Sequence, residues 1–343
     1  ADTVIDATGL AVSPGFINML SWGYNSLMDD GRALSDLKQG VTLEIFGEGT
    51  SPGPYWKGGK FTSFGEAMTM LEEKGVSVNI GSFLGAATTR ILEVGYKNRQ
   101  ATPSEMERMR GHVENSMKEG AMGIGSSLIY APGDYASTEE LTELSKVASE
   151  YGGMYISHLR SEGTNLLEAL EELISISRNA SIPAEVYHLK ASREPNWSKL
   201  DDVIKRIEEV RKEGLQITAD IYTYNASSTG LTGVIPTWVQ EGGHRAWINR
   251  MKDPEVRPRL LADIREQLDE QPPEGILLVG FKTSKMSRKY LAKTVAEAAA
   301  MRGQTPEEAI VDMVIEDDHR IQCIYFSMSE DNIRKKIQLP WVS

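Results

Sequence analysis

The segments Met154-Tyr155-Ile156-Ser157-His158 and Ala184-Glu185-Val186-Tyr187-His188 carry the pattern that decides the fold of this chain. Each is a short apolar or β-branched run that ends in a histidine, as expected for a buried strand with a polar side chain at its end. Similar runs begin at residues 122 and 216, so successive starts are 32, 30 and 32 residues apart. This interval fits one strand and one helix, and therefore predicts parallel strands built from βαβ units.

Seven runs in all are predicted as strands, over residues 15–20, 41–47, 78–85, 122–128, 154–159, 184–190 and 216–224. The stretches between them carry helix signals. Thr102 and Glu105 form a capping box that begins one helix, and Ser137 and Glu140 form another. Further helices are expected over the following ranges: 165–178 and 198–213.

Alternating strands and helices fit either a doubly wound sheet or a (β/α)8 barrel. No glycine-rich dinucleotide fingerprint follows the first strand, and residues 339–343 read as the beginning of an eighth strand. The barrel is therefore favoured, with residues 15–224 as strands one to seven. Residues 225–338 are predicted as a largely helical insertion after strand seven, which would lie as a lid over the mouth of the barrel and end in a return helix.

Both ends of the chain look cut, because it begins at Ala1 without a methionine and stops inside the strand-like run 339–343. We expect a fragment with a truncated eighth strand. The compartment is left open: cytoplasmic, or periplasmic or secreted if a signal peptide was removed with a missing N-terminus.

Composition excludes some partners. The sequence holds 37 Lys and Arg against 49 Asp and Glu, a net charge of −12 at pH 7, which argues against nucleic acid. No apolar run approaches the ~20 residues that span a bilayer, so a membrane partner is not expected either. With a single cysteine, Cys323, a metal site would have to use histidines and carboxylates.

The five histidines divide into two groups. Three are expected to have surface or packing roles: His112, His244 and His319. In contrast, His158 and His188 end consecutive strands, so a barrel would bring their imidazoles side by side at its C-terminal rim. Two such imidazoles can bind one zinc-like ion together with a third protein ligand. Glu48, between two glycines just past the second strand, is the candidate for that ligand.

Polar side chains also follow the later strands: Arg160, Lys190, Tyr222, Tyr224 and Ser228. Cations and hydroxyls around a metal would suit the carboxylate of an anionic substrate. The alternative for the two tyrosines is that their shared strand face simply packs against the insertion.

Several of these segments resemble a known family. Pro14-Gly15-Phe16-Ile17-Asn18 resembles the start of the amidohydrolase barrel. The segments around the two histidines, Ser157–Gly163 and Tyr187–Lys190, resemble the N-acyl-D-amino-acid deacylases (D-aminoacylases) of that superfamily, as does Asp220–Tyr224. The resemblance covers nearly the whole chain, and the two histidine segments are its specific part.

This resemblance implies a (β/α)8 metal-dependent hydrolase that cleaves the amide bond of N-acyl-D-amino acids, releasing a D-amino acid and a carboxylate. It implies a divalent metal ion, zinc, held by His158, His188 and Glu48, and a small-molecule substrate whose carboxylate binds Lys190, Tyr222 and Ser228. Arg160 and Tyr224 complete the expected substrate site.

The sequence departs from the family pattern at three places. The ligand after the second strand is a cysteine in the best-known members, where Glu48 or Gly49 aligns here, and Glu48 is expected to be the ligand because glycine has no side chain. Leu20 and Trp22 stand where the family has a His-x-His pair, so we expect one ion instead of two. The general-base aspartate of the family would lie beyond Ser343, so the fragment by itself is expected to be inactive. Residues 1–14 would be the remnant of an N-terminal β-sandwich and the lead-in to the barrel.

Two other functions stay open. Another amidohydrolase activity, on a cyclic amide or a β-linked dipeptide, would use the same metal site with different carboxylate contacts. A non-catalytic barrel that binds a metal or a ligand is the alternative outside enzymes. The oligomeric state is not indicated by the sequence.

Overall fold

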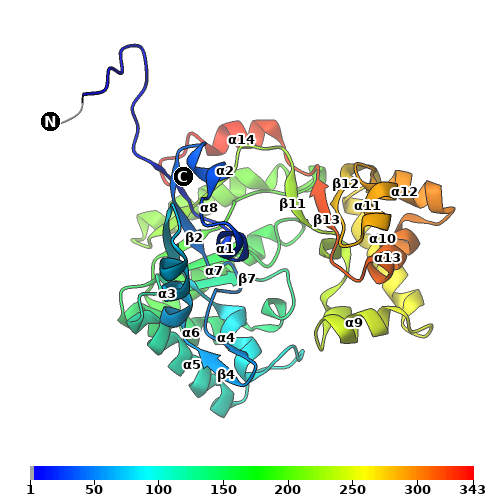
Figure 1. Cartoon of the computed structure of the whole chain (residues 1–343), viewed down its shortest axis with the longest axis horizontal. Coiled ribbons are helices and arrows are strands. Elements are labelled where there is room, and N and C mark those ends of the chain that lie inside the picture. Colours follow the sequence, from blue (N-terminus) through cyan, green and yellow to red (C-terminus); the bar gives the residue numbers. More distant parts are fainter. Residues whose placement is uncertain (1–3) are drawn as a thin grey trace.

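The computed structural model describes residues 4–343, and its parallel strands follow one another in the order of the chain (Figure 1). One sheet pairs β1 (Phe16–Asn18), β2 (Val41–Phe46) and β5 (Asn79–Ser82); a second pairs β6 (Leu84–Gly85), β7 (Gly123–Ser127), β8 (Met154–His158), β9 (Ala184–Val186) and β10 (Ile217–Ala219). Only Phe83 separates β5 from β6, so one extended segment joins both sheets. Val342 then forms a parallel bridge with Ala219 of β10.

Helices lie between these strands and cover them: α1 (Tyr24–Asp29), α2 (Leu34–Leu37), α3 (Phe64–Lys74), α4 (Ala86–Glu93), α5 (Pro103–Lys118), α6 (Thr138–Glu150), α7 (Leu166–Ala180) and α8 (Lys199–Lys212). The helices predicted over 165–178 and 198–213 are confirmed as α7 and α8. The capping box at Thr102 is also confirmed, because its side chain and that of Glu105 each accept the other's backbone N–H. Parallel strands with helices on the outside give the (β/α)8 architecture that the sequence predicted.

The predicted capping box at Ser137 is only half present. Ser137 accepts the backbone N–H of Glu140 and so caps α6. The Glu140 carboxylate, however, accepts from Nη1 of Arg90 at 2.6 Å. A fully buried guanidinium requires a charged partner more strongly than a half-buried N-cap requires a second hydrogen bond, which explains the difference.

Side chains alternate between the inner and the outer face of the strands, as the pleat requires. In β8, Tyr155 joins the large core between strands and helices, whereas Ile156 joins the inner cluster with Ile45, Phe83 and Tyr187. His158 has the same parity as Ile156 and therefore points toward the inside of the barrel, at its carboxyl-terminal end.

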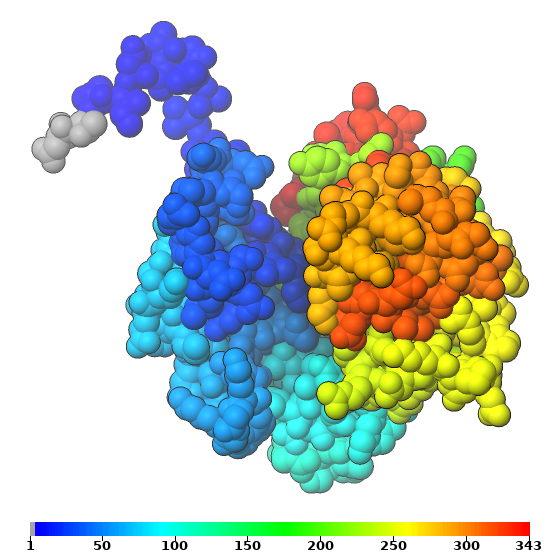
Figure 2. Space-filling model, turned by 45° about the vertical axis from the view of Figure 1, so that its right-hand side comes forward, coloured from blue at the N-terminus to red at the C-terminus, as the bar shows by residue number. Residues whose placement is uncertain are grey.

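Most of the predicted insertion, from Leu231 to Tyr325, has a hydrophobic core of its own (Figure 1). Its antiparallel sheet has the order β11 (Ser227–Gly230), β13 (Gln322–Tyr325), β12 (Ile276–Gly280). Its helices are α9 (His244–Met251), α10 (Arg257–Glu270), α11 (Ser284–Tyr290), α12 (Val295–Arg302) and α13 (Pro306–Asp317). The return helix α14 (Glu330–Lys336) lies outside this core and contacts the barrel, where Lys335 pairs with Asp201 of α8. Figure 2 shows the insertion facing the N-terminal part of the barrel across a hollow.

The remaining elements are short. The hairpin β3 (Tyr55–Lys57) and β4 (Lys60–Thr62) follows β2, and five 3-10 turns occur: η1 (Gly133–Tyr135), η2 (Glu194–Asn196), η3 (Leu231–Val234), η4 (Thr237–Gln240) and η5 (Pro273–Gly275). The helices described over residues 4–343 include none with the length and apolar character that crossing a bilayer requires.

Three predictions of secondary structure are corrected. The hairpin, β11 and β12 were not predicted, because strands of three to five residues are too short to show a clear alternation of polar and apolar side chains. The strand predicted over 216–224 ends at Ala219, so Tyr222 and Tyr224 lie in the segment that follows it. The strand predicted over 184–190 ends at Val186, because His188 adopts a left-handed φ of 37° that a strand does not permit.

Candidate metal centre

Glu48 lies directly after β2, in a tight turn between two glycines. Gly47 has a φ of 111°, and a Cβ there would lie 2.3 Å from the carbonyl oxygen of Phe83, so a side chain is excluded. The turn directs the Glu48 side chain inward, where it is only 6% exposed. A carboxylate buried to this degree requires donors or a cation around it.

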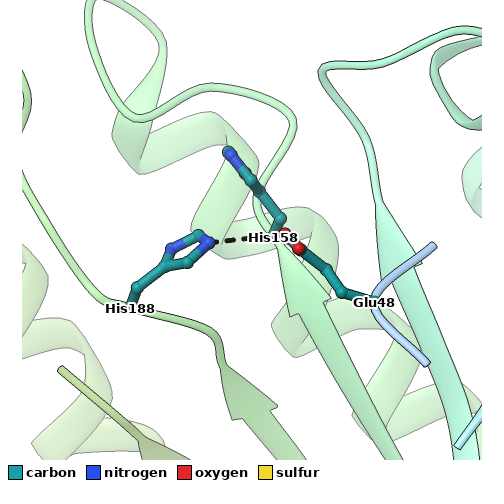
Figure 3. A group of neighbouring side chains, drawn as sticks. All are labelled: Glu48, His158 and His188. Atoms are coloured by element: carbon teal, nitrogen blue, oxygen red, sulfur yellow. Dashed lines mark hydrogen bonds and ion pairs between the residues drawn. The ribbon is translucent and has the colours of Figure 1, made fainter. Parts of the chain in front are cut away.

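His158 and His188 meet the Glu48 side chain from neighbouring strands. The two imidazole rings lie 4.6 Å apart between centroids and are nearly perpendicular. Nδ1 of His158 lies 3.0 Å from the carbonyl oxygen of Leu159, which leaves Nε2 free to bind another group. Nε2 of His188 lies 3.4 Å from Oε1 of Glu48. Figure 3 shows Glu48 and His188 pointing toward each other, with His158 next to their contact.

These three side chains have the geometry of a metal site. One donor atom from each of them lies within 4.8 Å of the others, and this is the one such group found among residues 4–343. Two imidazole nitrogens and a carboxylate oxygen form a donor set that suits zinc and leaves a coordination position open. The residues present therefore fit the divalent ion that the sequence predicted.

The burial of this group alters its proton affinities. Burial lowers the pKa of His158 to about 4 against the opposing effect of Glu162, so this imidazole is neutral near pH 7. Burial would raise the pKa of Glu48, but the hydrogen bond and charge of His188 outweigh it and hold the pKa below its usual value. Burial and Lys190 would lower the pKa of His188, but the hydrogen bonds to Glu162 and Glu48 outweigh them and raise it. His158 and Glu48 are therefore already in the protonation states that bind a metal ion, whereas His188 would release its proton on binding.

A second carboxylate, Glu162, lies behind the histidines. Its Oε1 is 3.1 Å from Nδ1 of His188 and 2.5 Å from Nζ of Lys190, whose side chain is 4% exposed. Although burial opposes it, the charges of His158 and Lys190 hold the pKa of Glu162 well below its usual value. The predicted substrate residue Lys190 is therefore already paired with a buried carboxylate.

The left-handed turn at His188 is held by residues from two other elements. Asp220, after β10, accepts the backbone N–H of His188 at 2.6 Å, and its own carbonyl oxygen accepts that of Leu189 at 2.9 Å. Lys336, at the end of α14, donates from Nζ to the carbonyl oxygen of Leu189 and is itself only 2% exposed. These contacts offset the strain of a positive φ at a residue with a side chain.

A cavity of about 1310 Å³ opens above the three candidate ligands. Besides these ligands, its lining includes four of the five predicted substrate-binding residues: Lys190, Tyr222, Tyr224 and Ser228. The Tyr222 ring lies 5.5 Å from Nζ of Lys190, and Ser228 donates to the carbonyl oxygen of Cys323 at 3.2 Å. Tyr224 is 71% exposed and lies at the mouth.

Arg160 is placed elsewhere. Its guanidinium donates to the Glu172 carboxylate at 2.8 and 2.9 Å and to the carbonyl oxygens of Asp134 and Ala136, and it does not line the cavity. The prediction that Arg160 binds substrate is therefore corrected: it anchors the loop after β7. Arg160 was predicted at the site because it lies two residues after His158. Side chains that follow the end of a strand can point in different directions, so this closeness in sequence did not place it in the cavity.

Three residues at the cavity were not predicted as part of the site. Tyr130 packs edge-on against His158 with 5.7 Å between ring centroids and pairs its hydroxyl with Thr229. Trp22 donates from its indole N–H to Oε2 of Glu48 at 2.9 Å. Arg320, just before β13, lines the cavity from the insertion and donates to Thr229 at 3.0 Å. Tyr130 lies three residues after the end of β7. The two histidines were predicted because side chains at the ends of parallel strands meet at the rim of the barrel, and the same argument could have identified Tyr130.

The other histidines lie outside this centre. His112 pairs with Glu93 at 2.7 Å, and His244 pairs with Asp318 at 2.8 Å. His319 is half-buried. Their predicted surface or packing roles agree with these positions.

The architecture of the chain is similar to that of a solved enzyme structure. The N-acyl-D-glutamate deacylase from Bordetella bronchiseptica, solved with zinc and a phosphonate inhibitor, superposes with a TM-score of 0.76 at 22% identity, over 96% of this chain and 64% of that chain. The fold is that of the amidohydrolase (β/α)8 enzymes, as the sequence predicted. No protein-family profile matches the chain.

Proteins of similar sequence show the family to which the chain belongs. A D-aminoacylase from Alcaligenes xylosoxydans xylosoxydans is 31% identical over 246 residues, which are 67% of this chain and 51% of the relative. An N-acyl-D-glutamate deacylase from the same organism is 28% identical over 245 residues, 67% of this chain and 50% of the relative. The chain is a homologue of the D-aminoacylases and N-acyl-D-amino-acid deacylases, which confirms the resemblance seen in the sequence. It spans about half the length of the curated relatives it matches.

Proposed function

We propose that this chain is the metal-binding barrel of an enzyme that hydrolyses the amide bond of N-acyl-D-amino acids. The observation that carries the proposal is the convergence of Glu48, His158 and His188 within 4.8 Å under a large cavity, in a homologue of deacylases. The products would be a D-amino acid and a carboxylate.

The three side chains would hold one zinc ion. A bound zinc ion lowers the pKa of a water molecule and polarises the amide carbonyl. Leu20 carries no ligand atom, and the indole of Trp22 is only a donor, so neither can bind a second ion. Single occupancy is thus part of the proposal.

The cavity walls would bind and orient the substrate. Tyr222 and Ser228 offer hydroxyls and Arg320 offers positive charge around the space above the ligands, and Lys190 lines the same space while it is paired with Glu162. A carboxylate held by these groups would keep the scissile amide against the metal, which contributes to rate by positioning. The aspartate general base that the resemblance implies after the eighth strand stays a prediction.

The test is hydrolysis by the full-length protein of a matched panel of N-acetyl-D- and N-acetyl-L-amino acids, a cyclic amide and a β-aspartyl dipeptide. Release of free amine from the D-isomers alone, lost after chelation and restored by zinc, is expected. Turnover of the cyclic amide or the dipeptide instead would support the other amidohydrolase activity. Metal binding without turnover of any of them would support a non-catalytic barrel.

A further inference from the structure

The two oxygens of the Glu48 carboxylate have different partners. Oε2 accepts the indole N–H of Trp22 at 2.9 Å. Oε1 faces Nε2 of His188 and the hydroxyl of Ser127, each at 3.4 Å. One oxygen is thus bonded to the indole, and the other faces the candidate ligand His188.

The segment that carries Trp22 is fixed to the same strand that carries Glu48. The backbone N–H of Ser21 donates to the carbonyl oxygen of Ile45 at 2.8 Å, and its hydroxyl donates to Glu44 at 2.6 Å. The backbone N–H of Gly23 donates in turn to the Ser21 hydroxyl at 3.0 Å. Donor and acceptor are therefore both positioned by β2, which fixes the separation between them.

We propose that Trp22 is the positioning residue that makes Glu48 a one-oxygen ligand. The proposal rests on the proposed function only in taking Glu48, His158 and His188 as the metal centre. With Oε2 engaged, the carboxylate presents Oε1 alone to the ion. Without the indole N–H, a carboxylate that is 6% exposed would have an oxygen with no donor, and it would turn to offer both oxygens to the metal.

Loss of an outer partner of a ligand typically weakens metal binding by about 10–100-fold. Trp22 is also suited to a clean test, because its side chain is 61% exposed and its loss leaves little empty space in the core. The substitution Trp22→Phe keeps an aromatic ring and removes only the N–H and the second ring. A matched control is Trp56→Phe on the β3–β4 hairpin, where the tryptophan is 64% exposed and lies outside the cavity lining.

The experiment measures the zinc dissociation constant by competition with a chromophoric chelator, together with the visible absorption of the cobalt(II)-loaded protein. Trp22→Phe is expected to bind zinc about 10–100-fold more weakly than wild type. Its cobalt absorption is expected to be weaker, because a two-oxygen ligand raises the coordination number. Trp56→Phe should match wild type in both, and all three proteins should unfold at the same temperature.

Equal zinc affinity and an equal cobalt spectrum in Trp22→Phe and wild type would overturn the inference while leaving the metal centre in place. A change of the same size in Trp56→Phe would also overturn it, because the effect would then not come from Glu48. A folded wild-type protein that binds neither metal would overturn both this inference and the proposed function.

Discussion

Nδ1 of His188 lies 3.1 Å from Oε1 of Glu162 and 2.7 Å from Nζ of Lys190, which Glu162 also contacts, while Nε2 of the same ring faces Oε1 of Glu48 at 3.4 Å. The imidazole is thus held between two carboxylates that follow different strands of the barrel. A carboxylate behind a histidine fixes its orientation and increases its basicity as a ligand. Glu162 therefore has a defined part in the centre without being one of the three candidate ligands.

Replacing Glu162 by Gln is expected to weaken zinc binding by about 10–100-fold, because the charge behind His188 is lost and Lys190 loses its buried partner. The zinc dissociation constant measured by chelator competition checks this. Glu270→Gln is the control, since Glu270 pairs with Arg193 and Thr164 away from the ligands. Unchanged affinity in Glu162→Gln would remove this role.

The stability of the barrel is expected to depend on the ion pair between Arg90 and Glu140. Both side chains are buried, and Arg90 also donates to the carbonyl oxygens of Lys97 and Arg99. Arg90→Met should lower the free energy of unfolding in urea by about 3–5 kcal/mol, because it leaves an unpaired carboxylate in the core. Lys118→Met, which breaks an exposed pair on α5, should produce no measurable change. A small loss in Arg90→Met would show that the pair is dispensable.

The free energy of unfolding is expected to depend on pH through the buried Lys336. Burial and the charge of Lys190 lower its pKa in the folded protein to about 8, from 10.5. Between these values the unfolded chain binds more protons, so wild type should gain stability with rising pH, by up to about 1.4 kcal/mol per pH unit. The difference in unfolding free energy between wild type and Lys336→Met, measured from pH 7.5 to 10.5, isolates this contribution. A difference independent of pH would contradict it.

Substitutions at Tyr222 and at Arg160 are expected to affect KM differently, because only Tyr222 lines the cavity. Tyr222→Phe removes a hydroxyl from the cavity and should raise KM several-fold for an N-acyl-D-amino acid. Arg160→Lys breaks the paired hydrogen bonds to Glu172 but leaves the cavity lining in place, so it should lower thermal stability with little change in KM. A larger effect on KM from Arg160 would restore its predicted substrate role.

Much of the fold and of the metal centre could be predicted, because the C-terminal ends of parallel barrel strands meet at the same rim. His158 and His188 follow successive parallel strands, so their proximity followed from spacing and strand direction alone. The direction of side chains in loops does not follow from spacing, which explains why Arg160 was misplaced. Trp22 and Arg320 depend on contacts with segments distant in sequence. Among the elements, β11 was missed because its Ser-Ser-Thr-Gly sequence is a strand only through pairing with β13.

The proposed metal centre is tested most directly by the metal content per chain, measured by elemental analysis after dialysis against zinc. Wild type should retain about one zinc ion, and Glu48→Ala, His158→Ala and His188→Ala should each lose it while remaining folded by circular dichroism. His112→Ala is the matched control and should retain the ion, because its imidazole pairs with Glu93 outside the centre. A folded wild type without metal, or retention of zinc in the histidine variants, would contradict the central claim that these three residues form a metal centre.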